Sequence, residues 1–333
     1  MTIVRVARNS LIVLFIAFIL TSPVLTSLHA QEVKRLVSTF SIVARDSVTG
    51  ELGVAVASRF FAVGSVVPWA KGDVGAVATQ ASANTSFGPR GLELLQKGAT
   101  PEEIVGILLR NDENREGRQF GIVASDGKSA TYTGPKYLPW AGGRSGANYA
   151  VQGNILAGEN VVAAMEEGFL KTRGTLADRM YAALVAGDKN GGDARGRQSA
   201  ALLVVKENAG YGGYSDRAID IRVDDHPEPF KELGRLLDYA QMNYAWNQGW
   251  TLFTQKRFSE ALPHIERAAS IQPENPEVLY DLGVIQLAAG KKDEALGSIQ
   301  KALGLNPKLK KQAVGDQDLN QLRSDPVFLR LIK

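Results

Sequence analysis

Two kinds of hydrophobic pattern divide the chain. From Ser38 to about residue 226, short runs rich in β-branched residues and alanine are bounded by glycine, a pattern typical of strands. Pairs of helical patterns interrupt these runs. After residue 230 the helical pattern continues without a convincing strand. The sequence therefore predicts an α+β domain followed by an all-helical one.

Strands and helix pairs alternate in blocks along the first domain. Strands are expected over 39–45, 52–58, 63–68, 74–79, 119–124, 129–133, 200–205 and 217–223, and helices over 89–97, 101–110, 159–171 and 175–187. Residues 46–50 (DSVTG) between the first two strands indicate a hairpin turn. The block order favours antiparallel sheets covered by helix layers over a doubly wound parallel sheet.

An internal repeat spans residues 243–308. Small residues, a large aliphatic residue and a proline recur at the 34-residue spacing of the tetratricopeptide repeat. The matching pairs are Gly249 and Gly283, Ala261 and Ala295, Ile265 and Ile299, Ala268 and Ala302, and Pro273 and Pro307. Two units are fewer than the three usually needed. A connecting amphipathic helix at 229–242 and a capping segment at 309–333 are expected to supply the missing packing.

Residues 1–30 predict a secretory signal peptide. Arg5 and Arg8 precede an apolar run from Leu11 to Leu20, and small residues lead to a cleavage site after Ala30. This run is shorter than the roughly 20 residues that cross a membrane, so an uncleaved anchor is the less favoured alternative. The protein is expected to be secreted or periplasmic, without a stable membrane anchor.

Composition removes several classes of chemistry. The 333 residues include no cysteine and only three histidines, so disulfides, thiolate nucleophiles and cysteine-bound metals are excluded. With 38 basic and 35 acidic residues, the charge gives no reason to expect a nucleic-acid partner. Asp224, Asp225 and His226 could together hold a cation, but a polar strand end is the favoured interpretation. Neither a metal nor another cofactor is expected.

One route to amide hydrolysis needs neither cysteine nor histidine. A chain-terminal threonine or serine can attack through its hydroxyl while its own α-amine, which titrates near 8, serves as general base. Thr39 begins the first expected strand and is the candidate nucleophile. Ser41 is a less well placed second candidate.

Several segments resemble a known family over residues 39–237. They are 39–46 (TFSIVARD), 53–69 (GVAVASRFFAVGSVVPW), 75–80 (GAVATQ), 88–95 (GPRGLELL), 139–143 (PWAGG), 151–158 (VQGNILAG), 191–200 (GGDARGRQSA) and 221–227 (IRVDDHP). The family that they resemble is the bacterial and archaeal domain of unknown function 1028. This family is grouped by fold with the N-terminal nucleophile (Ntn) hydrolases, and an older suggestion linked it to fimbrial assembly. The resemblance implies a four-layer αββα sandwich over residues 31–228.

The resemblance also implies roles for individual residues. It implies Thr39 as nucleophile, Ser58 and Arg59 near the active centre, and an oxyanion or substrate site at Thr79 and Gln80. Asn84 and Asn154 are candidate polar donors, and hydrogen bonding within loops is the alternative interpretation of both. Arg59 is expected to favour the neutral amine by like-charge repulsion.

The sequence departs from the superfamily pattern at two points. Ala57 stands where proteasome-like members place an aspartate. Signal cleavage would leave Gln31 as the terminus, so that Thr39 would be an internal residue without a free amine. Activity through Thr39 therefore requires a second cut between Ser38 and Thr39.

Two functions remain open on these grounds. One is a secreted or periplasmic Ntn-type amidohydrolase that uses Thr39. The other is a non-enzymatic envelope binding or assembly protein that docks a protein or peptide through its repeats. A homo-oligomer is expected in either case, although no sequence feature demonstrates it.

Overall fold

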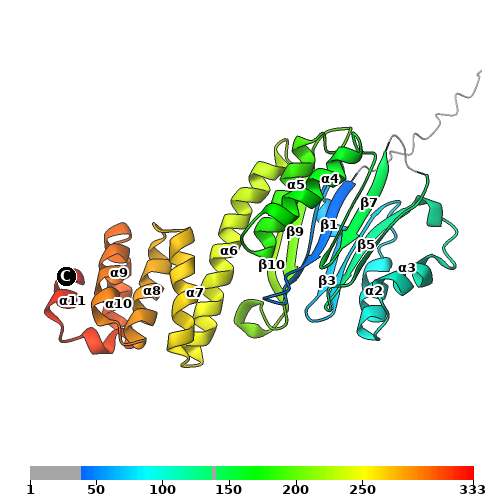
Figure 1. Ribbon diagram of the computed structural model, residues 1–333. Coiled ribbons are helices and arrows are strands. Elements are labelled where there is room, and N and C mark those ends of the chain that lie inside the picture. The colour runs from blue at the N-terminus through cyan, green and yellow to red at the C-terminus, as the bar shows by residue number, and fades with distance from the viewer. Residues whose placement is uncertain (1–38, 137–139) are drawn as a thin grey trace, which may run out of the picture. The chain divides into compact units, whose positions relative to one another are not determined.

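The computed structural model describes residues 39–136 and 140–333 (Figure 1). The predicted signal peptide, residues 1–30, lies outside the described residues. Within the two described stretches, no helix is both long and apolar enough to span a bilayer.

The first sheet, sheet A, has six antiparallel strands. Their order is β10 (Arg217–Val223), β9 (Ser199–Val205), β2 (Leu52–Ser58), β1 (Thr39–Arg45), β8 (Tyr149–Asn154) and β7 (Ala141–Gly146). The predicted turn joins β1 to β2, and Asp46 Oδ1 accepts hydrogen bonds from the backbone N–H groups of Val48 and Thr49 at 2.8 and 2.9 Å. As an interior strand, β1 is hydrogen-bonded on both sides from its first residue onward.

The second sheet, sheet B, has four antiparallel strands in chain order. They are β3 (Pro68–Lys71), β4 (Gly75–Ala81), β5 (Arg118–Ala124) and β6 (Ser129–Thr133). Its inner face packs on that of sheet A, where Val43 and Val54 meet Ala76, Ala78 and Val123. Apart from a group of polar residues near one end of the sheets, the inner strands are apolar on both faces, because both faces are covered.

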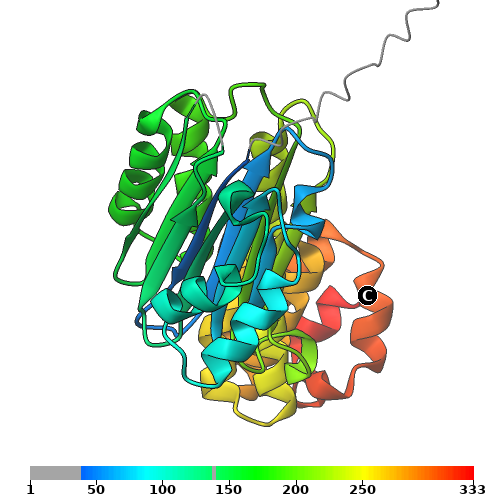
Figure 2. The ribbon, with the colours of Figure 1, turned by 90° about the vertical axis from the view of Figure 1, so that its right-hand side faces the viewer.

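Helices cover the outer face of each sheet (Figures 1 and 2). On sheet A they are α4 (Glu159–Lys171), α5 (Leu176–Lys189) and the start of α6 (Pro229–Thr254); on sheet B they are α2 (Phe87–Gln96) and α3 (Pro101–Leu109). The prediction of antiparallel sheets covered by helix layers is therefore confirmed.

The strand predicted over 63–68 is wrong. Residues Val63–Ser65 form a 3₁₀ turn, η1, and β3 begins only at Pro68. Ala62 has a left-handed φ of 52°, and the N–H groups of Val66 and Val67 both bond to the carbonyl of Val63. These local hydrogen bonds use the backbone groups that a strand would pair across the sheet.

The helical domain begins within α6. This helix runs without interruption across the boundary expected between residues 242 and 243. It is followed by α7 (Phe258–Ile271), α8 (Pro276–Ala288), α9 (Lys292–Leu305), α10 (Leu309–Gly315), η4 (Gln317–Leu322) and α11 (Pro326–Leu331). No strand occurs among residues 230–333, as predicted.

The 34-residue repeat is visible as a repeated contact. A Cβ placed on Gly249 would lie 3.2 Å from the backbone nitrogen of Ile265. A Cβ on Gly283, the matching residue, would lie 2.6 Å from Cγ1 of Ile299, which matches Ile265. In both units glycine therefore permits the close approach of two antiparallel helices.

The C-terminal segment packs on the second repeat. Leu319, Leu322 and Phe328 are fully buried in the same hydrophobic cluster as α8 and α9. The Tyr280 hydroxyl donates a hydrogen bond to Asp316 Oδ2 at 2.8 Å. These contacts cover apolar surface that a further repeat would otherwise bury.

Candidate active site

Thr39 lies at the start of β1 with its side chain between the two sheets. Only 1% of the residue is exposed. The antiparallel register pairs Thr39 with Ser58, the last residue of β2, so the two side chains lie on the same face. Thr39 Oγ1 is 3.0 Å from Ser58 Oγ, and either hydroxyl can be the donor. The structure therefore brings together two of the predicted site residues.

Two side-chain amides hold the carbonyl oxygen of Thr39. Gln80 Nε2 of β4 donates to it at 3.2 Å, and Asn154 Nδ2 of β8 donates at 3.3 Å. Gln119 Oε1 of β5 accepts from both amides, at 2.7 and 2.8 Å. Gln119 in turn donates through Nε2 to the carbonyl of Gly153 at 2.7 Å. The amides thus fix one another and position Thr39, rather than point into open space.

Ser41, the second candidate nucleophile, lies two residues further along the same face of β1. Its hydroxyl donates to Gln80 Oε1 at 2.6 Å and accepts from Gln152 Nε2 at 2.6 Å. The residue is fully buried. Both hydrogen-bonding directions of its hydroxyl are satisfied, so the geometry favours Thr39.

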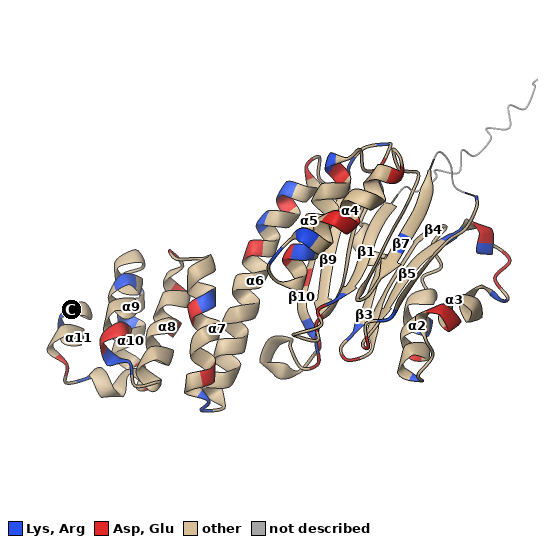
Figure 3. Ribbon diagram, in the orientation of Figure 1, with Lys and Arg blue, Asp and Glu red and all other residues tan. Residues whose placement is uncertain are grey.

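The polar cluster between the sheets carries no charge. Its members are Thr39, Ser41, Ser58, Gln80, Gln119, Gln152 and Asn154. Figure 3 shows charged residues mainly on helices and loops, with few along the strands. Among the described residues, Asp193 is the only charged one that is buried. Neutral groups pair between the sheets because burying an unpaired charge there would be costly.

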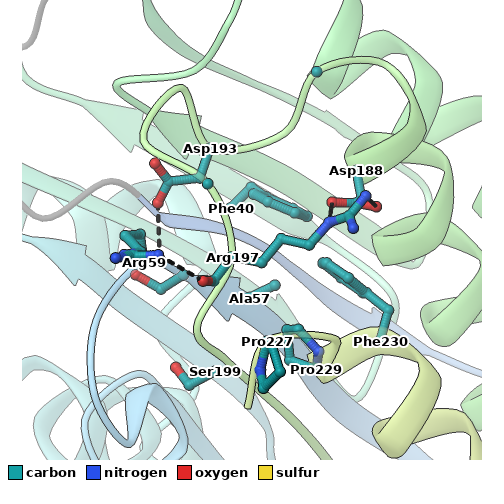
Figure 4. A pocket seen from close by; sticks show the side chains of 13 residues that line it. Phe40, Ala57, Arg59, Asp188, Asp193, Arg197, Ser199, Pro227, Pro229 and Phe230 are labelled. Atoms are coloured by element: carbon teal, nitrogen blue, oxygen red, sulfur yellow. Dashed lines mark hydrogen bonds and ion pairs between the residues drawn. The ribbon is translucent and has the colours of Figure 1, made fainter. Parts of the chain in front are cut away.

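A cavity of about 480 Å³ opens beside this cluster, at the end of sheet A where β1 begins and β2 ends (Figure 4). Its size falls within the roughly 300–1,000 Å³ of small-molecule sites. Phe40, Ala57 and Ser58 line it from the sheet, and Phe230 lines it from α6. Ser58 therefore belongs both to the cavity lining and to the cluster around Thr39.

Asp193 organises the side of the cavity near Arg59. The residue is 7% exposed, and its Oδ2 accepts from the backbone N–H of Arg59 at 2.8 Å. Arg195 bonds to the same carboxylate with its backbone N–H at 2.8 Å and with Nη2 at 2.9 Å. The Arg59 guanidinium reaches across the opening, where Nη1 donates to the carbonyl of Arg197 at 3.2 Å (Figure 4).

Arg197 is paired on the opposite side of the cavity. Its Nε and Nη2 donate to the two carboxylate oxygens of Asp188 at 2.6 and 2.7 Å. Hydrogen bonding to Asp188 is the main cause that raises the pKa of the Arg197 guanidinium, with a smaller charge contribution from Glu228. This bidentate pair fixes the loop that forms the cavity wall.

Two predicted site residues lie apart from Thr39. Gln80 faces Thr39, so the side chain of the preceding Thr79 is on the outer face of β4, where it donates to the carbonyl of Asn84 at 3.2 Å. The backbone N–H of Thr79 donates to Val67. Asn84 Oδ1 accepts from Ser86 in the turn before α2. An oxyanion role for Thr79 and Asn84 stays a prediction that no contact of Thr39 supports.

The candidate cation ligands near residue 226 are used locally. His226 Nδ1 accepts from the backbone N–H of Glu228 at 2.9 Å, just before α6. Asp225 Oδ1 accepts from Gln198 Nε2 at 3.2 Å. Both contacts fit the favoured interpretation of a polar strand end.

Four of the buried polar residues around the site were not predicted from the sequence. They are Gln119, Gln152, Asp193 and Ser199. Gln119 and Gln152 each occupy an inward position of a buried strand, which is a signal that could have indicated a buried polar cluster. Asp193 lies in a glycine-rich loop, and nothing local distinguishes it from a surface residue.

Comparisons with known proteins agree with the resemblance. The model of the family of unknown function DUF1028 matches residues 39–233, and a tetratricopeptide repeat model matches residues 252–312. A crystal structure of protein SPO2555 from Silicibacter pomeroyi, described as a DUF1028 member, is similar with a TM-score of 0.57 and 32% identity. The match covers 61% of this chain and 86% of that one. No curated protein matches.

The repeat model identifies the helical segment as tetratricopeptide repeats, which suggest protein–protein interaction. Since the first family model matches more than half of the chain, this protein belongs to the DUF1028 family of unknown function.

Proposed function

We propose that this protein is an Ntn-type amidohydrolase whose nucleophile is Thr39. One observation carries the proposal: the Thr39 hydroxyl lies at the first residue of an interior strand, 3.0 Å from Ser58 Oγ and beside a cavity of ligand size. Two sheets packed face to face, with helices on both outer faces, are also the layers expected of an Ntn hydrolase.

The reaction follows from the atoms available once Thr39 is a chain terminus. Its Oγ attacks the amide carbonyl carbon of a substrate, and its α-amine takes the hydroxyl proton. The tetrahedral adduct collapses, and the leaving amine departs with that proton. Water, deprotonated by the same α-amine, then attacks the resulting ester and releases the carboxylic acid. Gln80 and Asn154 hold the Thr39 carbonyl and thereby orient the residue throughout.

The proposal requires a precursor. We infer that residues 1–30 direct the chain to a secreted or periplasmic location, and that a second cut between Ser38 and Thr39 frees the amine. No carboxylate stands at Ala57 to hold the resulting ammonium. The Arg59 guanidinium would favour the neutral, basic amine by repulsion.

The nature of the N-terminus tests this function. Intact-mass analysis of protein from a secreting host should find a species that begins at Thr39. This species should hydrolyse members of a panel of small amides, and Thr39→Ala should lower kcat/KM by a factor of ~10³ or more, whereas Thr39→Ser should retain activity. The exposed Thr49→Ala is the control. Because the side chains that bond Thr39 do not titrate, the rate should rise through a single ionisation, which repulsion from Arg59 would place below the usual α-amine value of about 8.

Two results would refute the enzyme. One is a single species that begins at Gln31. The other is activity that persists unchanged in Thr39→Ala.

A second function is favoured by the repeats. Trp250, Phe253 and Phe258 form a partly exposed aromatic cluster, with ring centroids 4.9 and 5.5 Å apart in successive pairs. Such a cluster suits docking of a protein segment. If the terminus is Gln31 and Thr39 proves dispensable, a non-enzymatic envelope binding or assembly role becomes the favoured one.

A further inference from the structure

The cavity beside Thr39 has an apolar floor. Phe40 and Phe230 are stacked with ring centroids 6.2 Å apart and an interplanar angle of 15°, and Ala57 lies beside them in the lining. Pro227 and Pro229 complete the wall without adding a side-chain donor or acceptor. An aromatic or branched aliphatic group is the kind of substituent that such a surface binds.

The charges around this floor are unequally paired. The lining contains two arginines and two aspartates. Asp193 is already bonded to Arg195, and Asp188 is bidentate with Arg197. Within the part of the chain that the structure describes, the Arg59 guanidinium takes part in no ion pair, and its Nη1 donates to the Arg197 carbonyl. Among the described residues that line the cavity, Arg59 is therefore a cation that is not paired with a carboxylate.

The Arg59 side chain is also held in place. Its backbone N–H is bonded to buried Asp193, and Nη1 is bonded to the carbonyl of Arg197. A guanidinium has five N–H donors in a planar fork that matches a carboxylate, and one contact leaves donors available. A bound anion would thus meet a partner that is already oriented.

The cavity adjoins the proposed nucleophile through a residue that contacts it. Phe40 directly follows Thr39 in β1, and Ser58 lines the cavity while its Oγ is 3.0 Å from Thr39 Oγ1. A small molecule that pairs with Arg59 and packs on Phe40 would therefore lie against Ser58, the residue whose side chain contacts the Thr39 hydroxyl.

We propose that this cavity binds amides that carry a free carboxylate, with the carboxylate paired to Arg59 and an apolar side chain packed on Phe40 and Phe230. N-acylated apolar amino acids have this chemistry. Hydrolysis of such a substrate, which rests on the proposed function, consumes one water and gives a carboxylic acid and a free amino acid. Binding itself does not depend on that function.

A matched pair of probes tests the pocket. N-acetylphenylalanine and its neutral amide, N-acetylphenylalaninamide, differ at the carboxylate alone. Isothermal titration with the full-length chain carrying Thr39→Ala should show binding of the acid at least tenfold tighter than that of the amide, decreasing with added salt. Adding Arg59→Gln should weaken binding of the acid by a factor of ten or more and leave the amide unchanged.

Control variants distinguish the effect of losing the Arg59 charge on affinity from an effect of substitution on folding. Arg110→Gln, on an exposed arginine at the end of α3, should leave both affinities unchanged. Arg59→Lys, which keeps the charge but loses the planar fork, should give an intermediate affinity for the acid. Equal affinities for acid and amide, no binding of either probe, or acid binding insensitive to Arg59→Gln would overturn the proposal.

The design distinguishes failure of the pocket from failure of the enzyme. Binding is measured without Thr39, so a chain that hydrolyses nothing can still bind the acid through Arg59. Conversely, a wild-type chain that hydrolyses neutral amides as readily as their carboxylate counterparts would keep the proposed function and exclude this specificity.

Discussion

At the scale of single residues, the chain encloses its polar groups in pairs that satisfy one another. The hydroxyl of Thr39 is hydrogen-bonded to that of Ser58, and its carbonyl oxygen accepts hydrogen bonds from Gln80 and Asn154. An unsatisfied buried amide costs about 1–3 kcal/mol, so such a cluster forms only when every member finds a partner. The Thr39 geometry is therefore a property of several strands together.

Asp281 of α8 is a carboxyl group whose surroundings disfavour its charged form. Burial is the main cause that raises its pKa to about 6, and nearby Asp316 and Asp318 act in the same direction. Its Oδ2 accepts from Trp246 Nε1 at 2.7 Å. Because the folded pKa lies above the usual value, this group contributes stability below about pH 4 that is lost as pH rises through 6.

We expect Asp281→Asn to stabilise the protein at pH 7.5 by about 1–3 kcal/mol and to have a markedly smaller effect at pH 4.5. The asparagine stays neutral and keeps an acceptor for Trp246. Urea denaturation at the two pH values measures the difference, with exposed Asp293→Asn as the matched control. An equal effect at both pH values would contradict the assignment.

At the scale of elements, local pattern predicted most strands and all four helices of the first domain, because their apolar faces and caps are local. Thr100 caps α3 and Thr175 caps α5, each with an acidic residue in the first turn. The hairpin of β7 and β8 was not predicted. Strand β7 (AGGRSG) has little β propensity and forms because β8 pairs with it.

The site was less predictable than the fold. Thr39, Ser58, Gln80 and Asn154 were found from position and resemblance, and the structure brings them together. The cavity could not be predicted, because its lining includes Phe230. This residue is far from Phe40 in the sequence and contacts it only through packing of α6 on sheet A. No local pattern encodes such a contact.

The repeat predicts the effect of glycine substitutions. Gly283→Ala should destabilise the protein by about 1–3 kcal/mol, because the added Cβ would lie 2.6 Å from Ile299. Gly297→Ala, in the adjacent helix with nothing within 4 Å, should stabilise it by about 0.5–1 kcal/mol. Chemical denaturation of both variants measures these effects. Effects of the same sign would argue against close helix approach at Gly283.

At the scale of the whole molecule, helix α6 is shared by two hydrophobic clusters. Phe230, Leu233 and Leu237 belong to the cluster on the outer face of sheet A, whereas Met242 and Ala245 belong to that of the repeats. Between them, Gln241 Nε2 donates to Asp178 of α5 at 2.7 Å. One continuous helix therefore links the stability of the two regions.

A break in this helix should allow the two regions to unfold in separate transitions. Ala240→Pro, which costs about 3 kcal/mol or more in a helix interior, should convert a single calorimetric transition into two. Ala240→Gly, at about 1 kcal/mol, should lower the melting temperature while keeping a single transition. If Ala240→Pro also melts in one step, α6 is not the element that couples them.

The position of Thr39 in sheet A bears on how maturation of this protein would be detected. The ladders that β1 forms with β2 and β8 begin at Thr39, so every strand pairing described here lies on the C-terminal side of the Ser38–Thr39 bond. A cut at that bond would create a new amine without removing any of these pairings. The strand ladders of sheet A would then be the same in precursor and product. The two forms would differ in mass and in the reactivity of a single terminal nitrogen.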